Sequence, residues 1–359
     1  MGIFETVKPL IYKTDPEFAH NAVEFIFKTA RRCPLFFNWM IEKNFIDDPV
    51  LNQKIWGLEF KNPVGVAAGF DKNATMIAAW PALGFGWGEI GAVTPKPQPG
   101  NPKPRAWRHI KYEAVQNAYG FNNEGVEVIK RRLQKIYPFI LPIGANIGKN
   151  KTTPEENAIE DYKILVKELK DVVDFFVVNI SSPNTPGLRD LLNASFISSL
   201  FGELKKITQK PILIKFSPDM ENEDIINLAN LSVLYGCDGI IVTNTTVNYE
   251  LINSPVKKGG ISGKPLAKRS YEVLRIVASE IFGKVPIISV GGIDSAEEAY
   301  KRIKAGASLL QIYTAIIYKG PGIIREINKG LIELLKKDGF NHISEAVGVD
   351  IPKKLENKN

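Results

Sequence analysis

The feature that most constrains the fold of this chain is a regular alternation of short β-rich runs with amphipathic stretches. The amphipathic stretches carry apolar residues three and four positions apart, which is the spacing of one helix face. Eight strands that alternate with helices are the count of a closed (β/α)₈ barrel. The predicted strands are Val64–Ala68, Trp87–Val93, Leu141–Ile147, Phe175–Ile180, Pro211–Phe216, Gly239–Thr243, Val285–Val290 and Leu309–Tyr313. The predicted helices include Pro154–Lys170, Glu223–Tyr235, Leu266–Phe282 and Ala296–Ala305.

The rival architecture within the α/β class is an open, doubly wound sheet. That fold carries a glycine fingerprint, G-x-G-x-x-G, directly after its first strand. This chain has the sequence AAGFDK at residues 67–72 instead. An open sheet also rarely needs eight βα units, so the sequence favours a TIM barrel.

The composition is that of an ordinary soluble, core-forming protein: of 359 residues, 44% are hydrophobic and 24% are charged. The net charge is +7, but Lys and Arg are spread along the chain without a dense block, so no nucleic acid partner is expected. Cys33 and Cys237 lie far apart in the sequence, which argues against a disulfide scaffold or a zinc site and fits a reducing cytosol. The sequence has no run of about 18 uncharged apolar residues and no secretion signal.

Residues 1–48 do not follow the barrel rhythm and are predicted to form a helical extension in front of a barrel domain at residues 49–359. Asp15-Pro16-Glu17 is typical of a helix start, and this helix is expected to run to about Arg32. Pro34 starts a second helix with apolar residues on almost every side. Two helices and one barrel wall can hardly bury all of them, so the segment predicts a membrane or partner contact. The alternative is that both helices simply cap the barrel.

Polar residues recur where the predicted strands end, which is the edge where α/β barrels place their chemistry. The fourth strand runs into Asn179 and a loop with Ser182, Asn184 and Thr185, and the prolines of this loop stiffen it. A proline-rich excursion, Val93–Asn123, follows the second strand and excludes a helix or a central strand there. A single residue of this kind is usually a turn former. That explanation does not account well for polar residues at the ends of several predicted strands. The other strand-end residues are Lys72, Asn146, Lys215, Thr243, Asn244, Thr245 and Thr246.

Three elements after the late strands indicate a phosphate site, because bare backbone N–H groups and helix starts hold phosphate in barrels. These elements are Gly291-Gly292, Tyr313-Thr314 and the loop Gly259–Gly263. A neutral polar pocket with a phosphate anchor predicts a bound phosphorylated cofactor that carries the chemistry. FMN fits best, with Lys215 stabilising negative charge on the reduced ring.

Two common classes of hydrolase are disfavoured. His20, His109 and His342 do not lie at predicted strand ends, which argues against a His-based triad or a zinc hydrolase. No paired carboxylates lie at strand ends, which argues against a glycosidase. No metal is expected.

Five motifs resemble those of the dihydroorotate dehydrogenases, and more narrowly those of the quinone-dependent, membrane-associated class 2. The resemblance extends from about Asp15 to Gly322. The motifs are AGFDK at 68–72, TPKPQPGNP at 94–102, NISSPNT at 179–185, TNTT at 243–246 and VGGID at 290–294.

The resemblance implies that dihydroorotate lies on the FMN ring, passes its C6 hydride to the flavin and loses its C5 proton to Ser182 as base. Thr185 and Phe121 would enclose a water path that relays this proton. The substrate, or its product orotate, would be bound by Lys72, Asn117, Ala118, Tyr119, Gly120, Phe121, Asn179, Asn184, Asn244 and Thr245. One non-covalent FMN would be held by Ala68, Gly69, Ala92, Asn146, Asn179, Lys215, Thr243, Gly263, Gly292, Tyr313 and Thr314. Ala92 departs from many relatives, which have a hydroxyl at this position.

Two features assign the class by resemblance. Soluble class 1 enzymes use a Cys as base, whereas this loop offers Ser182. Class 2 enzymes carry two N-terminal helices that rest on the lipid bilayer surface and form the quinone entrance, and by that likeness His20 and Arg105 line the quinone tunnel. The resemblance implies a monomeric peripheral membrane protein, on the cytoplasmic face of the inner membrane if the source is bacterial. The alternatives are a soluble dihydroorotate dehydrogenase that uses fumarate or NAD, and a non-catalytic barrel that docks on membranes.

Overall fold

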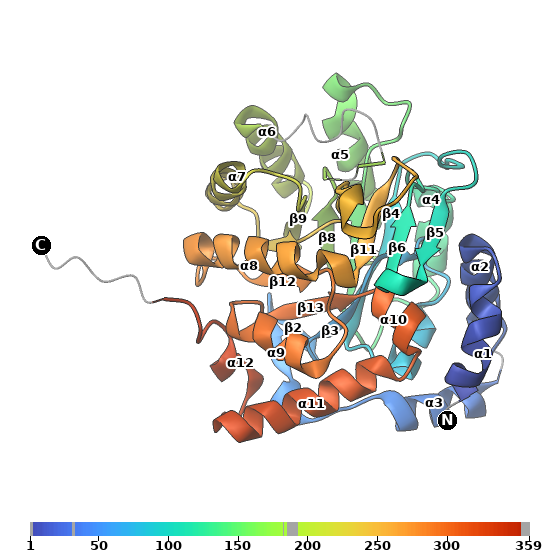
Figure 1. The fold of residues 1–359 in the computed structure, drawn as a ribbon. Coiled ribbons are helices and arrows are strands. Elements are labelled where there is room, and N and C mark those ends of the chain that lie inside the picture. The colour runs from blue at the N-terminus through green and yellow to red at the C-terminus, as the bar shows by residue number, and fades with distance from the viewer. Residues whose placement is uncertain (1–2, 31–32, 182, 185–192, 353–359) are drawn as a thin grey trace, which may run out of the picture.

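The computed structural model describes residues 3–30, 33–181, 183–184 and 193–352. Its centre is a closed barrel of eight parallel strands surrounded by helices (Figure 1). The strands follow one another around the barrel in chain order, so the predicted (β/α)₈ TIM barrel is confirmed. They are β3 (Val64–Asp71), β4 (Trp87–Val93), β7 (Ile143–Ile147), β8 (Phe175–Val178), β9 (Ile212–Phe216), β10 (Gly239–Val242), β12 (Ile287–Val290) and β13 (Leu309–Ile312).

Four of the barrel strands begin directly after a proline, and one of them, β3, follows Pro63 and begins where it was predicted. Pro142, Pro211 and Pro286 precede β7, β9 and β12, and a proline has no N–H to donate to a neighbouring strand. These strands therefore begin one or two residues later than predicted. β3 continues beyond its predicted end to Asp71, whose carboxylate accepts hydrogen bonds from the backbone N–H groups of Thr75 and Met76 at 2.8 Å each.

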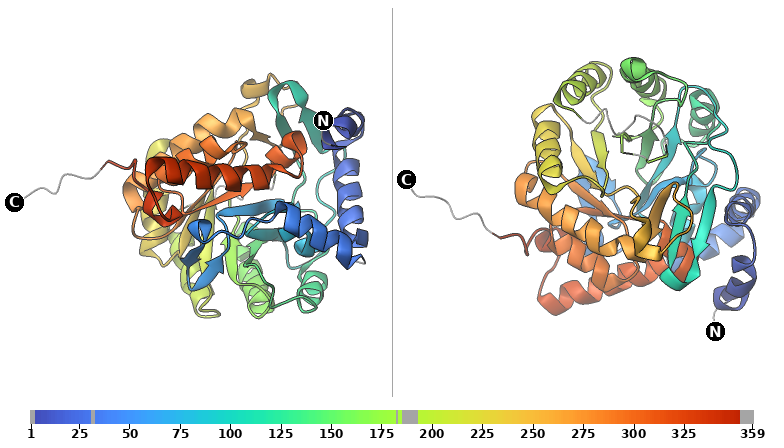
Figure 2. Two further views of the ribbon diagram at one scale, coloured as in Figure 1. Left: turned by 90° about the horizontal axis from the view of Figure 1, so that it is seen from below. Right: turned by 45° about the horizontal axis from the view of Figure 1, so that its top comes forward.

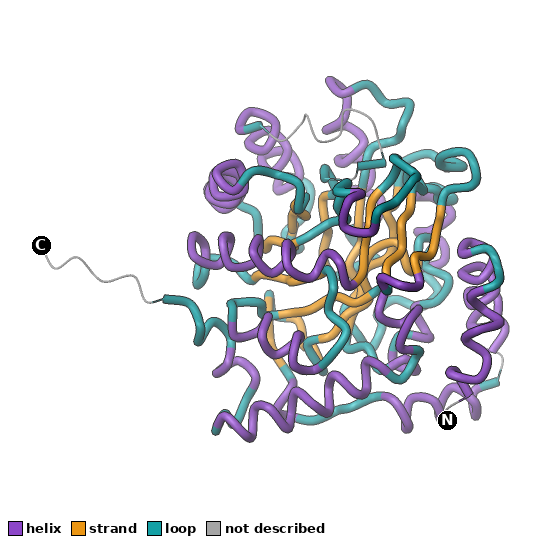
Figure 3. Tube along the Cα trace, viewed as in Figure 1, coloured by secondary structure: helices purple, strands orange, loops and turns teal. Residues whose placement is uncertain are grey.

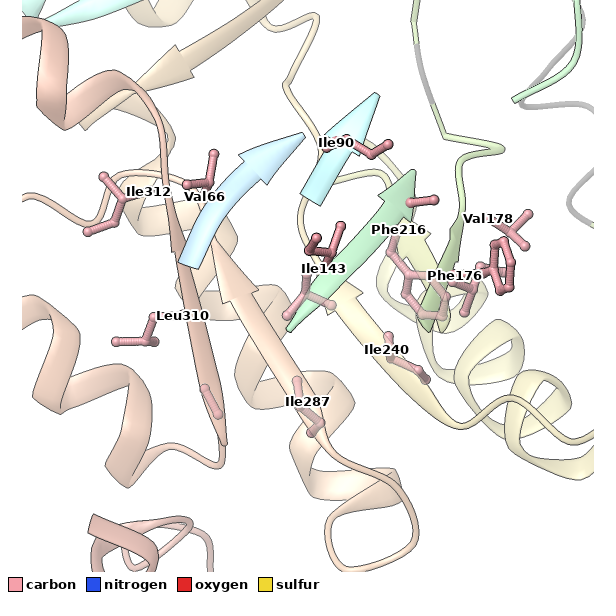
Figure 4. Packing of buried hydrophobic residues seen from close by; sticks show 14 of the residues in the cluster. Val66, Ile90, Ile143, Phe176, Val178, Phe216, Ile240, Ile287, Leu310 and Ile312 are labelled. Atoms are coloured by element: carbon pink, nitrogen blue, oxygen red, sulfur yellow. The ribbon is translucent and has the colours of Figure 1, made fainter. Parts of the chain in front are cut away.

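The helices form a layer outside the strands (Figure 3). Outward-facing strand residues such as Phe176, Ile240 and Leu310 are fully buried in the apolar core between the barrel and this layer (Figure 4). This packing follows from the near-continuous apolar runs that parallel strands require when both faces are covered. The outer helices are α4 (Val126–Leu133), α5 (Ala158–Leu169), α6 (Ala194–Lys205), α7 (Asn222–Leu234), α8 (Ala267–Ile281), α9 (Ala296–Lys304), α10 (Thr314–Lys319), α11 (Ile323–Asp338) and α12 (Ile343–Ala346).

The barrel interior has an apolar floor and a polar upper layer. Near the amino ends of the strands, Trp87 and Phe175 fill the interior. The hairpin of β1 (Gln53–Ile55) and β2 (Leu58–Phe60) adds Phe60 to this floor, packed edge-on against Trp87. Alternation along β4 then places Glu89 one layer above Trp87 on the same inner face. The floor therefore closes one end of the barrel, and the polar layer faces the carboxyl ends.

A small antiparallel sheet borders the carboxyl ends of the barrel strands. It consists of β5 (Ala106–His109), β6 (Ala114–Asn117) and β11 (Gly260–Gly263), with β6 in the middle. The sequence analysis did not predict these strands. The prediction that the proline-rich segment contains no central strand holds, since β5 and β6 lie outside the barrel sheet. The prediction that it contains no helix holds for α-helices, but a single 3-10 turn forms at Ile110–Tyr112.

The N-terminal segment forms three helices on the outside of the barrel (Figure 2). The second helix contacts β5, whereas the third packs against residues 79–83. The predicted helices are α2 (Pro16–Ala30) and α3 (Pro34–Asn44), and the unpredicted α1 (Ile3–Tyr12) precedes them. Phe37 is buried against the barrel, but Leu35, Phe25 and Trp39 are 82%, 69% and 53% exposed. The expected exposed apolar face is therefore present. Among the described residues, no helix is both long and apolar enough to cross a bilayer.

The barrel floor generates a stability prediction. A Cβ at Gly144 in β7 would overlap the ring of Phe175, and both positions are fully buried. We expect Gly144→Ala to lower the free energy of unfolding by about 1–3 kcal/mol, because overpacking a filled core forces neighbours to move. Urea unfolding of the purified protein measures this change.

Gly202→Ala is the matched control, because a Cβ at Gly202 in α6 meets nothing within 4 Å. This substitution should raise stability by about 0.5–1 kcal/mol through helix propensity. Equal effects of the two substitutions would contradict the packing described for the floor.

Candidate active site

A cavity of about 470 Å³ opens where the barrel strands end, at the edge predicted to carry the chemistry. Its polar part is lined by side chains from the barrel and its loops, including Lys72, Asn117, Asn179, Asn184, Lys215, Thr243, Asn244 and Thr245. Its apolar part continues between the barrel and the N-terminal helices, where it is lined by residues such as Phe4, Ile11, Val23, Ile26, Phe27, Ile316 and Ile317. One continuous space therefore joins a polar region to an apolar one.

Three asparagines at the carboxyl ends of β7, β8 and β10 form a hydrogen-bonded row, which we call the amide chain: Asn146, Asn179 and Asn244. Asn179 Nδ2 donates to Asn146 Oδ1 at 3.0 Å, and Asn244 Nδ2 donates to Asn179 Oδ1 at 3.4 Å. The last amide also donates to Ser181 Oγ at 3.1 Å. Parallel strands place their carboxyl ends at one edge, which is why residues so far apart in sequence meet here.

A buried carboxylate that the sequence analysis missed lies at the start of the amide chain. Asn146 Nδ2 donates to Glu89 Oε2 at 3.1 Å, and Gln311 Nε2 donates to Glu89 Oε1. Burial raises the pKa of Glu89, and the opposing charge of Lys215 and these two hydrogen bonds counteract the rise. Burial likewise lowers the pKa of Lys215, and Glu89 counteracts it. The only sequence signal was one acidic residue inside an otherwise apolar predicted strand.

Lys72 is the cation at the open end of the site. Its Nζ lies 4.5 Å from the centre of the Tyr119 ring. Burial lowers the pKa of Lys72 to about 8, and the carboxylates of Glu24, Glu17 and Asp71 counteract this effect. Beside it, Asn184 Nδ2 donates to Asn117 Oδ1 at 3.3 Å, which ties the loop after β8 to the end of β6. A cation and two amides therefore face the same part of the cavity.

A second cavity of about 50 Å³ lies at the predicted phosphate site. It is lined by Gly263, Gly292 and Thr314, among other residues. A Cβ at Gly292, whose φ is +76°, would lie 2.5 Å from the Cα of Ala267, so a larger residue does not fit there. The two cavities share Ser262, Val290, Gly291 and Tyr313 as lining residues.

Arg302 is a fully buried residue of α9 that was not predicted as part of the site. It contacts the phosphate-side loop from the outer helix layer. Its guanidinium donates to the carbonyl of Gly291 at 3.1 Å and to that of Ala267 at 2.9 Å. Glu298 Oε1 accepts from Arg302 Nε at 2.7 Å, so the buried charge is paired. This arrangement fixes the glycine loop against the start of α8.

The remaining predicted site residues divide into three groups. Ala68, Gly69, Ala92, Gly120 and Phe121 line the large cavity. Ala118 does not; it is buried, and its carbonyl accepts from Asn101 Nδ2 at 3.0 Å. Ser182 and Thr185 lie outside the described residues.

The structure differs from the prediction at Arg105. This residue does not line the cavity, because its guanidinium is bound by Glu17 at 2.7 and 3.1 Å and by the carbonyls of Pro99 and Asn101. Arg108, three residues later, lines the cavity instead and donates to the carbonyls at the end of α1. His20 does line the cavity, and burial together with Lys72 lowers its pKa to about 3, so its ring is neutral.

The polar barrel mouth, the phosphate-side loop and the apolar extension occur together in one described site. A family model described as dihydroorotate dehydrogenase matches residues 50–335. The chain belongs to the dihydroorotate dehydrogenase family. It is therefore an enzyme of a flavin-dependent family, and the idea of a non-catalytic barrel is set aside.

Individual dihydroorotate dehydrogenases are similar over nearly the whole chain. A relative from Nautilia profundicola, named dihydroorotate dehydrogenase (quinone), is 84% identical over 358 residues and is covered completely, as is this chain. A relative of the same name from a Nitratiruptor species is 55% identical, with 97% of this chain and 99% of the relative covered. The predicted quinone-dependent class is thus confirmed over the soluble alternative.

A solved structure shares the fold. The crystal structure of a dihydroorotate dehydrogenase from Eimeria tenella, in complex with ferulenol, has a TM-score of 0.86 to this chain at 35% identity. The superposition covers 96% of this chain and 98% of that one. Because 96% of the chain is covered, most of the helical extension at residues 1–48 is included in the likeness, together with the barrel.

The Glu17–Arg105 pair generates a prediction, because it connects α2 to the proline-rich loop of this dihydroorotate dehydrogenase. Both side chains are buried. We expect Glu17→Gln to lower stability by about 3 kcal/mol, since it leaves a buried guanidinium without its counter-charge. Limited proteolysis should then cut the N-terminal helices faster than in the wild type.

Glu5→Gln serves as the control, because Glu5 forms only an exposed pair with Lys8 at 3.4 Å. Such pairs contribute about 0–1 kcal/mol. Equal proteolysis rates in Glu17→Gln and the wild type would show that Glu17 does not hold α2 against the proline-rich loop.

Proposed function

We propose that this chain oxidises dihydroorotate to orotate in pyrimidine biosynthesis, with FMN as its prosthetic group and a membrane quinone as the final electron acceptor. The observation that carries the proposal is the single cavity that joins an amide-lined barrel mouth to an apolar space under the N-terminal helices. A polar substrate and an apolar acceptor need these two environments.

The proposed substrate site offers a hydrogen-bonding or charged partner to each polar group of a dihydropyrimidine carboxylate. The ring amides would bind to the side chains of Asn117, Asn179, Asn184 and Asn244, because buried amide groups are costly unless both partners are satisfied. Lys72 would bind the carboxylate. Tyr119, Gly120 and Thr245 would border the ring, while Ala118 would contribute only by supporting the loop that carries them.

The residues that would hold FMN fit its shape and charge. Thr243 Oγ1 is buried and has no hydrogen-bond partner among the described residues, so a bound flavin would satisfy it. Gly263, Gly292 and Thr314 would hold the phosphate in the small cavity, and Ala68, Gly69, Ala92, Asn179 and Tyr313 would border the ring. Asn146, which lines neither cavity, would support the ring site through its hydrogen bond from Asn179. These residues would thereby hold a group that, when bound, would supply a hydride acceptor for the substrate and an electron donor for the quinone. Lys215, beside Glu89, would favour negative charge on the ring.

Ser182 is the proposed base that takes the C5 proton, and Thr185 with Phe121 would enclose the water path that assists it. A serine hydroxyl is a weak base in water, so its proton needs a relay. The neighbouring Ser181 is described, and its Oγ accepts from the amide chain at Asn244. This contact brings Ser181, the residue before Ser182, to the ring-binding amides.

The quinone would enter through the apolar part of the cavity. His20 and Arg108 line this part, and we now propose Arg108 in place of Arg105. The exposed apolar face of α2 and α3 would rest on the bilayer surface, on its cytoplasmic side if the source is bacterial. We further propose that residues 1–48 act as the membrane-contact unit of a monomeric enzyme whose barrel is residues 49–359.

The test of this proposal is the absorption spectrum of purified protein before and after anaerobic addition of dihydroorotate. The wild type should show an oxidised FMN spectrum that bleaches on mixing. Ser182→Ala should keep the flavin but bleach about 10²–10⁴-fold more slowly, which is the usual contribution of a general base. A colourless protein, or a flavin that dihydroorotate does not bleach, would refute the function, and unchanged kinetics in Ser182→Ala would remove Ser182 from its role.

The pKa of Lys72 generates a prediction about pH. Because this pKa is lowered to about 8, Lys72 is cationic below pH 8 and becomes neutral above it. The dissociation constant for orotate should therefore be flat up to about pH 8 and then rise, by at most about tenfold per pH unit. Calorimetric titrations between about pH 7 and pH 9 measure it. Lys72→Arg, which stays charged in this range, should remove the rise; a flat wild-type profile would contradict the assignment.

A further inference from the structure

Glu89 is the buried charged residue of the barrel interior for which the proposed chemistry has no direct use. It is 0% exposed and lies one layer below the cavity, above the apolar floor of Trp87. Each of its two oxygens accepts a side-chain hydrogen bond, one from Asn146 and one from Gln311. Because both carboxylate oxygens act as acceptors, both neighbours turn their amino groups toward Glu89.

This constraint propagates along the amide chain. Once Asn146 directs its Nδ2 at Glu89, its Oδ1 faces the next residue, and that residue must donate. Asn179 donates to it at 3.0 Å, which leaves Asn179 Oδ1 to accept from Asn244 at 3.4 Å. The last amide then accepts through Oδ1 from the backbone N–H of Thr245 at 2.8 Å. Every amide in the row points the same way.

We propose that Glu89 is a positioning residue that fixes the direction of the amide chain and thereby selects the donor and acceptor pattern of the ring bound above it. An amide flipped by 180° has nearly the same shape, so packing alone does not choose between its two orientations. The carboxylate makes the choice because the wrong orientation would set two acceptors face to face. Glu89 reaches the substrate only through Asn146 and Asn179, so it is not a catalytic residue.

The inference rests on the proposed function, because it concerns the selectivity of the same site. Glu89→Gln keeps the shape but can donate as well as accept, so it no longer dictates a direction. The probes are orotate and its 4-amino analogue, cytosine-6-carboxylate, in which a ring donor and the adjacent carbonyl acceptor change places. Calorimetry on the flavin-loaded full-length protein measures both dissociation constants without any turnover.

We expect the wild type to prefer orotate over the analogue by at least about 100-fold, since a site built around hydrogen bonds rejects ligands that leave its polar groups unpaired. Glu89→Gln should weaken orotate binding by about 10- to 100-fold and reduce the preference to less than about tenfold. Glu168→Gln is the matched control. Glu168 lies on α5 and pairs with Lys130 at 2.8 Å, outside the cavity, so this variant should keep both wild-type values.

Two outcomes would overturn the inference while leaving the function intact. One is wild-type affinity and preference in Glu89→Gln. The other is an equal weakening of both ligands, which would make Glu89 a packing residue only. If Glu89→Gln does not load flavin, Asn146→Ser carries the test, because serine interrupts the row while Glu89 stays charged, and an undiminished preference in it likewise overturns the inference. If the wild type binds neither ligand, the inference and the proposed function fall together.

Discussion

The site depends on one constraint: polar groups inside a closed barrel must find their partners inside it. Glu89 and Lys215 introduce opposite charges into the interior, and Asn146 and Gln311 bind the carboxylate from two sides. Toward the amino ends of the strands, the aromatic floor at Trp87 fills the interior, so the polar layer ends there. The polar groups above this layer, such as the amide chain and Thr243, therefore face the carboxyl ends of the strands. A planar ligand bound there would provide further hydrogen-bond partners for them.

The N-terminal helices contribute charge to the same site. Glu17 pairs with Arg105, and Glu24 accepts from the hydroxyl of Thr75 at 2.7 Å, just past the end of β3. Both carboxylates favour the charged form of Lys72. The segment that presents an exposed apolar face is thus electrostatically connected to the cation of the barrel mouth. Removing α2 would change the substrate end of the cavity as well as its apolar end.

The barrel was predictable because its signal is local: each strand is an apolar run with a helix after it. Local signals failed elsewhere for identifiable reasons. α1 contains Pro9, a residue that disfavours a helix interior, and β5, β6 and β11 are only four residues long. Glu89 was missed because its partners are 57 and 222 residues away in sequence. Arg105 was predicted to line the cavity in place of Arg108 because the sequence does not show that Glu17, on α2, binds the Arg105 guanidinium.

The way the two cavities meet determines how the proposed ligands would be arranged. Gly291 and Tyr313 line both cavities, so a cofactor anchored by its phosphate in the small one extends directly into the large one. Arg302 donates to the Gly291 carbonyl and so holds the phosphate-side loop in place relative to the amide chain. The polar part of the large cavity lies toward the amide chain, and its apolar part lies toward α1 and α2. A charged pyrimidine and an apolar acceptor would therefore occupy different parts of one cavity.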